Sequence, residues 1–272
     1  MQAFPISPGA LLAAPWRHRQ LLARLVHRDV VGRYRGSLIG LGWSFFNPLF
    51  MLAVYTFVFG TIFKARWPST SGGHDEFAVV LFCGLVVFGL FSECFTRAPQ
   101  LVLEQPNFVK KIVFPLEVLP WVALGGALFH LSVGLLVLVP AVWWVRGAIP
   151  LTAVLVPFAL APLILLVLGL GWFLGALGVF LRDIGQAIGL LSSALMFLSP
   201  VFYSLDTLPP SIGTVLAMSP LAFAIEAVRD LLIWGRTPNL YGWAIHTVMC
   251  ALIAWLGFVW FQKTRRGFGD VL

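Results

Sequence analysis

The sequence predicts an all-α polytopic membrane protein with six transmembrane helices, and composition is the first reason. Of the 272 residues, 60% are hydrophobic and only 11% are charged, and the mean hydropathy is +0.93. A soluble domain carries about 45–50% apolar and about 25% charged residues. The second reason is length, because several windows reach the ~20 apolar residues that a helix needs to cross a hydrocarbon core about 30 Å thick.

Six windows have the length and composition of membrane spans. They cover residues 38–63, 77–96, 116–145, 151–181, 184–204 and 242–262. Prolines within the third and fourth windows leave the bounds of the third to fifth helices open. The chain accordingly divides into an N-terminal segment (1–37), a six-span membrane domain (38–262) and a short tail (263–272).

The eighteen lysines and arginines are spread unevenly over the segments between these windows. Most of them fall on one side of the membrane if the N-terminus is cytoplasmic, and the positive-inside rule favours that orientation. An even number of spans then places both termini of this multi-pass protein in the cytoplasm. This asymmetry explains the net charge of +7, so nucleic acid is not an expected partner.

The first ordered segment outside the spans is expected to be a basic helix over residues 11–35. Arg17, Arg24, Arg28 and Arg35 recur at intervals of seven, four and seven residues. This spacing places the four arginines on one face of a helix, and a basic amphipathic helix lies in the plane of the lipid headgroups. Such a helix either anchors the N-terminus or brings its arginines to an anionic, lipid-linked substrate.

The segment 97–115 is too polar to cross the membrane and too apolar for an idle linker. Its apolar side chains are Leu101, Val102, Leu103, Phe108 and Val109. They need a partner surface, which predicts a docking element rather than a solvated turn.

The segment 205–240 contains a helix with clear start and stop signals. Ser219 suits the N-cap, Pro220 the first helical position and Gly235 the C-terminal stop. At 1.5 Å per residue, a helix of about fifteen residues is about 22 Å long, which is too short to cross. We therefore expect a re-entrant outer pair of short helices between the fifth and sixth spans.

The chain lacks the motifs of nucleotide and metal chemistry. None of its lysines follows a glycine, so no GxxxxGK[ST] loop can cradle phosphates. The five histidines have no HExxH or paired-ligand spacing, so no metal site is expected. ATP and Mg²⁺ would have to be bound by a separate partner subunit, and this chain is expected to hold no cofactor.

Only one ionisable side chain, Glu93, lies well inside a window. Ionisable groups at membrane depth often mark ion-coupled transport, but one carboxylate is thin evidence for a proton relay. A position beside an aqueous channel or near the inner headgroups is the favoured interpretation.

Aromatic residues make up 14% of the chain and form two stripes. The stripes are Tyr55, Phe59 and Phe63 in the first window and Phe88, Phe91 and Phe95 in the second. Spacings of three and four residues place each set on one helix face. These faces contact lipid or neighbouring helices, or they line a channel along which sugar rings slide, and spacing alone leaves both interpretations open.

Three pairs of glycines are spaced four residues apart. They are Gly36 with Gly40, Gly171 with Gly175, and Gly185 with Gly189. A pair of small residues at this spacing lets two helix backbones approach closely, so the pairs predict contacts between spans, or alternatively self-association of the chain.

Five stretches stand out in order along the chain. They are "RDVVGRYRGSLIGLGWSFFNPLFMLAVYTFVFGTIF" (28–63), "EQPNFVKKIVFPLEVLP" (104–120), "FLRDIGQ" (180–186), "LSPVFYSLDTLP" (198–209) and "SPLAFAIEAVRDLLIWGRTP" (219–238). Together they resemble the permease subunits of bacterial ABC-type polysaccharide exporters, which move O-antigen, capsule or teichoic acid polymers. The resemblance covers nearly the whole chain, and five motifs in order are more specific than any one of them.

The resemblance implies two copies of this chain forming a channel, with two copies of a separate ABC ATPase bound below. It implies a lipid-linked polysaccharide as the substrate and ATP hydrolysis by the partner, which agrees with the missing nucleotide loop. It makes residues 101–110 the element that couples the chain to the ATPase. The coupling residues are then Glu104, Asn107, Phe108 and Lys110.

The resemblance also assigns roles at both membrane faces. Residues 28–36 become a gate at the cytoplasmic entrance, where Arg28, Arg33, Tyr34 and Arg35 meet the pyrophosphate of the lipid-linked glycan. Arginine suits this contact because its planar fork donates two hydrogen bonds to phosphate oxygens while staying charged. The aromatic stripes become the channel lining, and Glu226, Arg229 and Asp230 become an outer gate.

Three other functions compete with polysaccharide export. An ABC exporter of drugs or small lipids would share the six spans, but it is disfavoured by the five motifs. An ion-coupled carrier would be expected to show inverted repeats and more buried charges. A polytopic membrane transferase would need paired acid and base groups, whereas Asp29, Glu104 and Asp183 are scattered among the loops.

Overall fold

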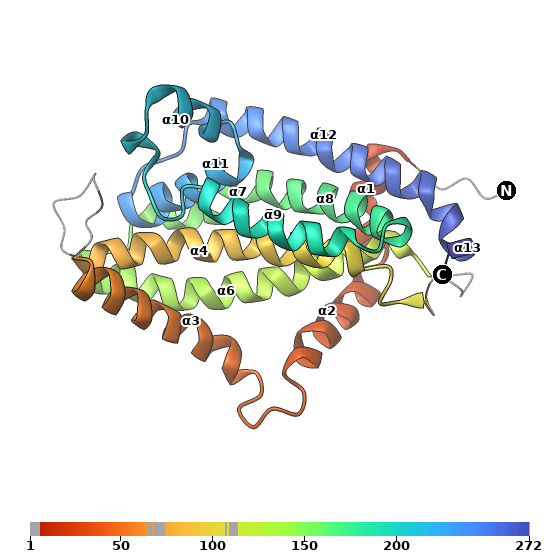
Figure 1. Ribbon diagram of the computed structural model, residues 1–272, viewed down its shortest axis with the longest axis horizontal. Helices are drawn as coiled ribbons and strands as arrows, with labels where there is room; N and C mark the ends of the chain where they lie inside the picture. Colours follow the sequence, from red (N-terminus) through yellow and green to blue (C-terminus); the bar gives the residue numbers. More distant parts are fainter. Residues whose placement is uncertain (1–5, 65–66, 68–73, 107, 109–113, 272) are drawn as a thin grey trace.

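The computed structural model describes residues 6–64, 67, 74–106, 108 and 114–271, and these contain helices and no strands. Long helices lie side by side in one bundle, and α1 (Pro8–Arg17) and α13 (Phe268–Val271) lie at the same end of it (Figure 1). We call this end the terminal end and the opposite end the distal end. The predicted all-α, multi-pass architecture is confirmed.

The elements of the bundle have the following bounds. The α-helices after α1 are α2 (Arg19–Tyr34), α3 (Gly42–Tyr55), α4 (His74–Arg97), α6 (Leu119–Arg146), α7 (Val156–Ala159), α8 (Ala161–Phe180), α9 (Ile184–Leu198), α10 (Pro210–Ala217), α11 (Pro220–Arg229), α12 (Leu240–Thr264) and α13. The 3₁₀ turns are η2 (Ala98–Gln100), η3 (Leu116–Val118), η4 (Leu151–Leu155), η5 (Leu205–Thr207) and η7 (Arg265–Gly267), and two π-helical segments are η1 (Thr56–Ile62) and η6 (Asp230–Trp234).

Five helical stretches are long and apolar enough to cross a membrane. They are Gly42–Ile62, Glu76–Gln100, Leu116–Arg146, Leu151–Phe180 and Leu240–Val271. The predicted fifth span, 184–204, holds the shorter helix α9, which runs back along α8 toward the distal end (Figure 1). It stops at Leu198 because Ser199 precedes a proline and is extended, with φ −89° and ψ 151°.

The predicted outer pair between the fifth and sixth windows is present as α10 and α11. Helix Pro210–Ala217 and helix Pro220–Trp234 meet at 94°. Ser219 occupies the N-cap and Pro220 the first position as expected, although the Ser219 side chain makes no capping hydrogen bond. Gly235 stops the helix in the left-handed region, with φ 69°.

The N-terminal segment differs from the single helix expected over residues 11–35. The chain breaks at His18 into α1 and α2, so Arg17 lies on another helix than Arg24 and Arg28, while Arg35 lies beyond the end of α2. The prediction that four arginines share one face is therefore wrong. Helix α2 packs on α6 instead, with Leu25 buried.

The most extensive contact between two helices of the bundle joins α8 to α12. A Cβ added at Gly257 would collide with the carbonyl oxygen of Gly169, and one added at Gly169 would lie 2.8 Å from the backbone of Ala254. Glycine therefore sets this contact, as it commonly does between membrane helices. The glycines that make the contact are not among the predicted pairs.

The predicted glycine pairs have mixed outcomes. Gly171 and Gly175 do pack, because added Cβ atoms would lie 3.1 Å from Pro120 and 3.4 Å from the carbonyl of Ala98. Gly36 and Gly40 instead serve a turn, with φ +87° and +56° and open space around them. Gly185 and Gly189 approach no other backbone in the described residues. Within one chain, the prediction of contacts between spans is right for one pair and wrong for the other two.

Among the five stretches long enough to cross a membrane, the one that contains α3 is the exception to this packing, since no residue of α3 is buried. It approaches the bundle toward the distal end and diverges from α4 and α6 toward the turn at residues 35–41 (Figure 1). Together α2 and α3 form a V beneath α4 and α6, and the space inside this V holds the candidate site.

Candidate functional site

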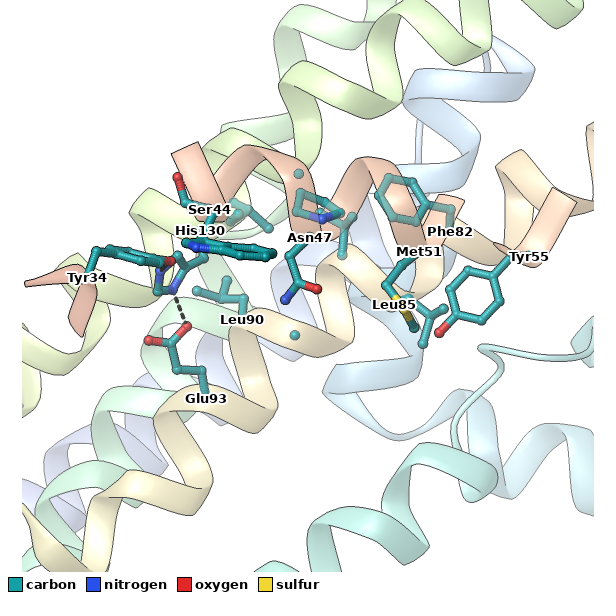
Figure 2. A pocket seen from close by; sticks show the side chains of 16 residues that line it. Tyr34, Ser44, Asn47, Met51, Tyr55, Phe82, Leu85, Leu90, Glu93 and His130 are labelled. Atoms are coloured by element: carbon teal, nitrogen blue, oxygen red, sulfur yellow. Dashed lines mark hydrogen bonds and ion pairs between the residues drawn. The ribbon is translucent and has the colours of Figure 1, made fainter. Parts of the chain in front are cut away.

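A pocket of about 540 Å³ lies between α3 on one side and α4 and α6 on the other (Figure 2). Most of its wall is apolar, with Met51, Leu85 and Leu131 among the lining residues. Its end nearest α2 is polar, because Tyr34, Glu93 and His130 meet there. The pocket thus combines an apolar body with a polar end, as small-molecule sites commonly do.

Behind this polar end, four charged side chains from two helices form a charge cluster of Asp29, Arg33, Glu93 and Arg97. Arg33 pairs with Asp29 at 2.9 Å and with Glu93 at 2.5 Å. Arg97 donates to both oxygens of Asp29, at 2.7 and 3.1 Å. Two carboxylates and two guanidiniums balance in charge, which is how partly buried charges are tolerated. The cluster ties α2 to α4.

His130 brings α6 into the same network. Its Nδ1 lies 2.8 Å from a Glu93 oxygen, and its Nε2 lies 3.0 Å from the Tyr34 hydroxyl. A neutral imidazole fits this arrangement by donating from Nδ1 to the carboxylate and accepting from the phenol. The histidine therefore fixes the end of α2 against the two spans.

Burial alone would raise the pKa of the Asp29 carboxyl, because it penalises the charged form. The hydrogen bonds and positive charges of Arg97 and Arg33 outweigh burial and hold this pKa below its ordinary value of 3.8. Burial likewise lowers the pKa of Arg33, but Glu93 and Asp29 raise it by more. The ion pairs of α2 therefore stay charged at neutral and mildly acidic pH.

The four residues predicted to meet pyrophosphate have different surroundings. Arg33 and Tyr34 belong to the network just described, and the Arg28 guanidinium lies 5.8 Å from the centre of the Phe108 ring. Arg35 is exposed just beyond α2, and no carboxylate of the described residues pairs with it. The structure thus brings Tyr34 to the pocket and Arg33 to the charge cluster behind it, and it leaves Arg35 open.

The aromatic stripe of α4 does not face an open passage. Phe88, Phe91 and Phe95 are only 6%, 3% and 5% exposed and belong to the hydrophobic core. Within one chain they pack the bundle, so the expectation that they line a channel is corrected: neighbouring helices cover this face.

The stripe of the first span is split between two environments. Tyr55 lines the pocket. Phe59 packs on Phe77 with ring centres 5.4 Å apart, and Phe63 is 67% exposed. The three rings still follow one another in a row, with ring centres 6.4 and 5.7 Å apart, although the helix changes to a π-helical turn at Thr56.

The predicted coupling segment is only partly described. Glu104 is exposed, and Phe108 stacks on Phe114 at 4.1 Å; Asn107 and Lys110 lie outside the described residues. Leu101 and Val102, expected to dock on a partner, are buried inside this chain. The role of Glu104 and Phe108 as ATPase contacts stays a prediction.

The predicted outer gate centres on Arg229, which is completely buried. It donates to the carbonyls of Val80 at 3.1 Å and Val201 at 2.8 Å, and it pairs with Glu226 at 2.9 Å. Asp230 begins η6, and its carbonyl accepts from the backbone N–H of Arg236 at 2.8 Å. Arg229 thus fixes α11 to α4 and to the end of α9, and a gating role for these residues stays a prediction.

Sequence reasoning missed Asp29, Arg97 and His130. A usable signal existed, because Asp29–Arg33 and Glu93–Arg97 are each four residues apart and can pair on one helix face. Nothing in the sequence says that these two faces meet, or that His130 lies between them. In the described residues no group of histidines, cysteines and carboxylates could hold a metal ion.

A comparison with protein families identifies the chain. The model of the ABC-2 type transporter family matches residues 20–233. The chain belongs to this family. The prediction of the family is therefore confirmed, and the helices of the match include α3, α4, α6, α8, α9 and α11.

Curated relatives match most of the length of this ABC-2 chain. It is 26% identical to the O-antigen export system permease protein RfbA of Klebsiella pneumoniae, covering 93% of this chain and 95% of the relative. It is 25% identical to the RfbA protein of Myxococcus xanthus, covering 94% and 96%. The polysialic acid transport protein KpsM of Escherichia coli is 24% identical, covering 76% and 79%.

Proposed function

We propose that the protein is the channel-forming permease of an ATP-driven exporter that moves a lipid-linked surface polysaccharide across the bacterial inner membrane. The observation that carries this proposal is the end-to-end similarity to proteins named as O-antigen export permeases. A relative named for polysialic acid transport extends the similarity to a second polymer. Export of drugs or small lipids finds no support among these relatives.

The working assembly in this proposal contains two copies of the chain and two copies of a separate ATPase. The outer face of α3 supports a second copy, because no residue of this helix is buried although its other face borders α4 and α6. The large exposed residues on it include Trp43, Phe45, Phe46, Leu49 and Phe50. Exposed apolar surface of this extent faces either lipid or a partner.

The ATPase is expected at the terminal end of the bundle, which the charge distribution makes cytoplasmic. The turn after α4 lies there, with Leu101 and Val102 anchored inside the chain and Glu104 exposed. An anchored turn with an exposed tip can transmit a push from the ATPase directly into α4. ATP and Mg²⁺ are bound by that subunit, and this chain supplies no cofactor.

Pyrophosphate contact is best assigned to Arg35 and Arg28. Arg33 is held by two carboxylates, so an anion would first have to displace Glu93 or Asp29. Arg35 needs no such exchange, since no described carboxylate pairs with it. Arg35→Gln should lower export at unchanged protein level, with Arg24→Gln as the matched control from the exposed face of α2.

The test of the function is deletion of the gene in its own host, followed by localisation of the long-chain polysaccharide. Loss of surface polymer with lipid-linked polymer trapped inside, reversed by complementation, is the expected result. Normal surface polymer in a host without a second exporter would contradict polysaccharide export.

A further inference from the structure

The predicted coupling segment, residues 101–110, begins on the surface of α8. It is preceded by η2, in which Ala98 and Pro99 are buried. A Cβ added at Gly178 of α8 would collide with the carbonyl oxygen of Pro99. One added at Gly175 would lie 3.4 Å from the carbonyl oxygen of Ala98. Such close backbone contact leaves little room for sliding, so the entry to the coupling segment is fixed to α8.

The exit from the coupling segment is held by the C-terminal part of the chain. Arg265, which follows α12 directly, donates from Nη1 to the Glu117 carboxylate at 2.6 Å and from Nη2 to the backbone carbonyl of Phe114 at 2.7 Å. Phe114 lies just before η3, and Glu117 lies within it. The side chains of the ion pair are only 13% and 18% exposed. One guanidinium thus joins the end of α12 to two points of the returning chain, and we call this contact the Arg265 bridge.

Both ends of the Arg265 bridge are themselves fixed to α8 and α12. The indole of Trp172 in α8 donates to the backbone carbonyl of Glu117 at 3.0 Å. On the other side of the bridge, the ring of Phe268 is fully buried, and its centre lies 5.5 Å from that of Phe261 in α12. The bridge therefore joins two anchored parts of the chain.

The chemistry of the bridge favours a positioning role over a purely stabilising one. A shielded ion pair is weak evidence for stability, because the loss of hydration cancels much of the attraction between the charges. Its geometry is demanding, however, since a planar guanidinium reaches both acceptors only if Phe114 and Glu117 keep one position relative to α12. The bridge thus fixes where the coupling segment leaves the bundle.

We propose that Arg265 is a positioning residue in the coupling of ATP hydrolysis to transport, because it ties the exit of the coupling segment to α12 through Glu117. The inference rests on the proposed function. With its entry fixed to α8 and its exit to α12, a displacement of the segment by the ATPase moves both helices with it as one body. Without the bridge the segment yields at its exit, and part of each displacement is lost.

Arg265→Gln tests the bridge in the complete transporter with its ATPase, in proteoliposomes that contain the host's lipid-linked polysaccharide. The measured quantity is the amount of polymer translocated per ATP hydrolysed. Lys263→Gln is the matched control, because it removes the same charge from the exposed surface at the end of α12. Lys263 belongs to none of the ion pairs in the part of the chain that the structure describes.

Arg265→Gln should lower the polymer translocated per ATP several-fold while protein level and ATPase binding stay normal, and Lys263→Gln should not. Arg265→Lys should recover only part of the ratio, because an ammonium keeps the ion pair but lacks the fork that reaches both acceptors. An unchanged ratio in folded Arg265→Gln protein would overturn the proposal. An equal fall in hydrolysis and translocation leaves the ratio unchanged and would overturn it too, since a merely structural defect lowers both together.

A double variant shows whether the two side chains act as one unit. Glu117→Gln removes the charge but keeps an acceptor for Arg265, so it is the milder change. If both act through the bridge, the combination of Glu117→Gln with Arg265→Gln should be no worse than Arg265→Gln alone. Losses that multiply would contradict the bridge. Should Arg265→Gln fail to accumulate, Glu117→Gln and Arg265→Lys decide, and a wild-type ratio in both would overturn the proposal.

The outcomes separate this inference from the proposed function. If deletion of the gene abolishes surface polymer while Arg265→Gln keeps the wild-type ratio, the protein is an exporter and the role of the bridge is wrong. If deletion leaves surface polymer normal, the function itself is wrong.

Discussion

Helices α3 and α4 are both apolar enough to span a membrane, yet they are used in opposite ways. In α4 and its extension, Glu76–Gln100, 72% of the best apolar window is buried inside the protein, whereas in Gly42–Ile62 the corresponding share is 0%. Apolar sequence therefore indicates membrane depth and not burial in protein. What each helix contacts depends on its individual side chains and not on its mean hydropathy.

The contacts that hold helices together also differ between two halves of the molecule, the packed half of α8 and α12 and the open half of α2 and α3. Glycine contacts press α8 and α12 together backbone to backbone, and Trp172 between them is fully buried. Helix α2 is held to α4 instead by ion pairs that are partly exposed to solvent, and α3 carries no charged residue. Close-packed interiors resist deformation, so the packed half is suited to be a frame and the open half to move and meet the substrate.

The largest expected effect comes from breaking the frame. Gly257→Leu drives a side chain into the carbonyl of Gly169, and because backbone cannot yield as a side chain can, the cost should reach about 3 kcal/mol or more. Little folded protein should remain in the membrane, measured as protein level and melting temperature in detergent. Gly189→Leu is the control, and a Gly257→Leu protein as stable as this control would contradict the packed-frame description.

A smaller effect is expected from loosening α2. Asp29→Asn removes the carboxylate that pairs with Arg33 and Arg97, and since these side chains are 19–28% exposed, we expect a cost of roughly 1–2 kcal/mol. Docking can be followed by a disulfide between Val26→Cys and Gly125→Cys, because an added Cβ at Gly125 lies 3.4 Å from the Val26 Cβ.

The crosslink should form more slowly in Asp29→Asn than in the wild-type background. Arg24→Gln serves as the control, since Arg24 is exposed on the same helix and belongs to none of the ion pairs among the described residues. Equal crosslinking in Asp29→Asn and Arg24→Gln would show that the charge cluster does not hold α2.

The pH dependence of α2 docking follows from Asp29. Because its folded pKa lies below 3.8, its contribution is fully present above that value and is lost as pH falls through the lower, folded pKa. The distance between spin labels on Arg24→Cys and Leu136→Cys should therefore stay constant from about pH 8 to about pH 5. Undocking already near pH 6 would mean that another group controls α2.

The smallest effect is expected on the outer face of α3. Leu49 is 45% exposed, so Leu49→Ala should change the stability of a single chain by no more than about 0.5 kcal/mol. Melting temperatures of monomeric protein in detergent measure this, with Leu231→Ala from the buried core as the contrast. A large loss in the monomer would show that α3 packs against its own chain after all.

Much of the fold could be predicted because its signals are local. Pro220 and Gly235 mark the ends of the outer helix, and the structure places both as expected. The pocket could not be predicted, because it depends on how α3 is rotated and how far it diverges from α4. The stripe of Phe88 and Phe91 illustrates the limit: the same spacing serves a channel wall or a buried face, and only the neighbouring helices decide which.

We expect that α2 and α3, the open half, handle the polymer while α8 and α12, the packed half, stay fixed relative to each other. The most direct test places spin-label pairs across α3 and α6 and across α8 and α12 in the complete transporter, and compares distances without nucleotide and during ATP hydrolysis with lipid-linked polymer. We predict that the α3–α6 distance changes and the α8–α12 distance does not. An unchanged α3–α6 distance, or an equal change in both pairs, would contradict the account.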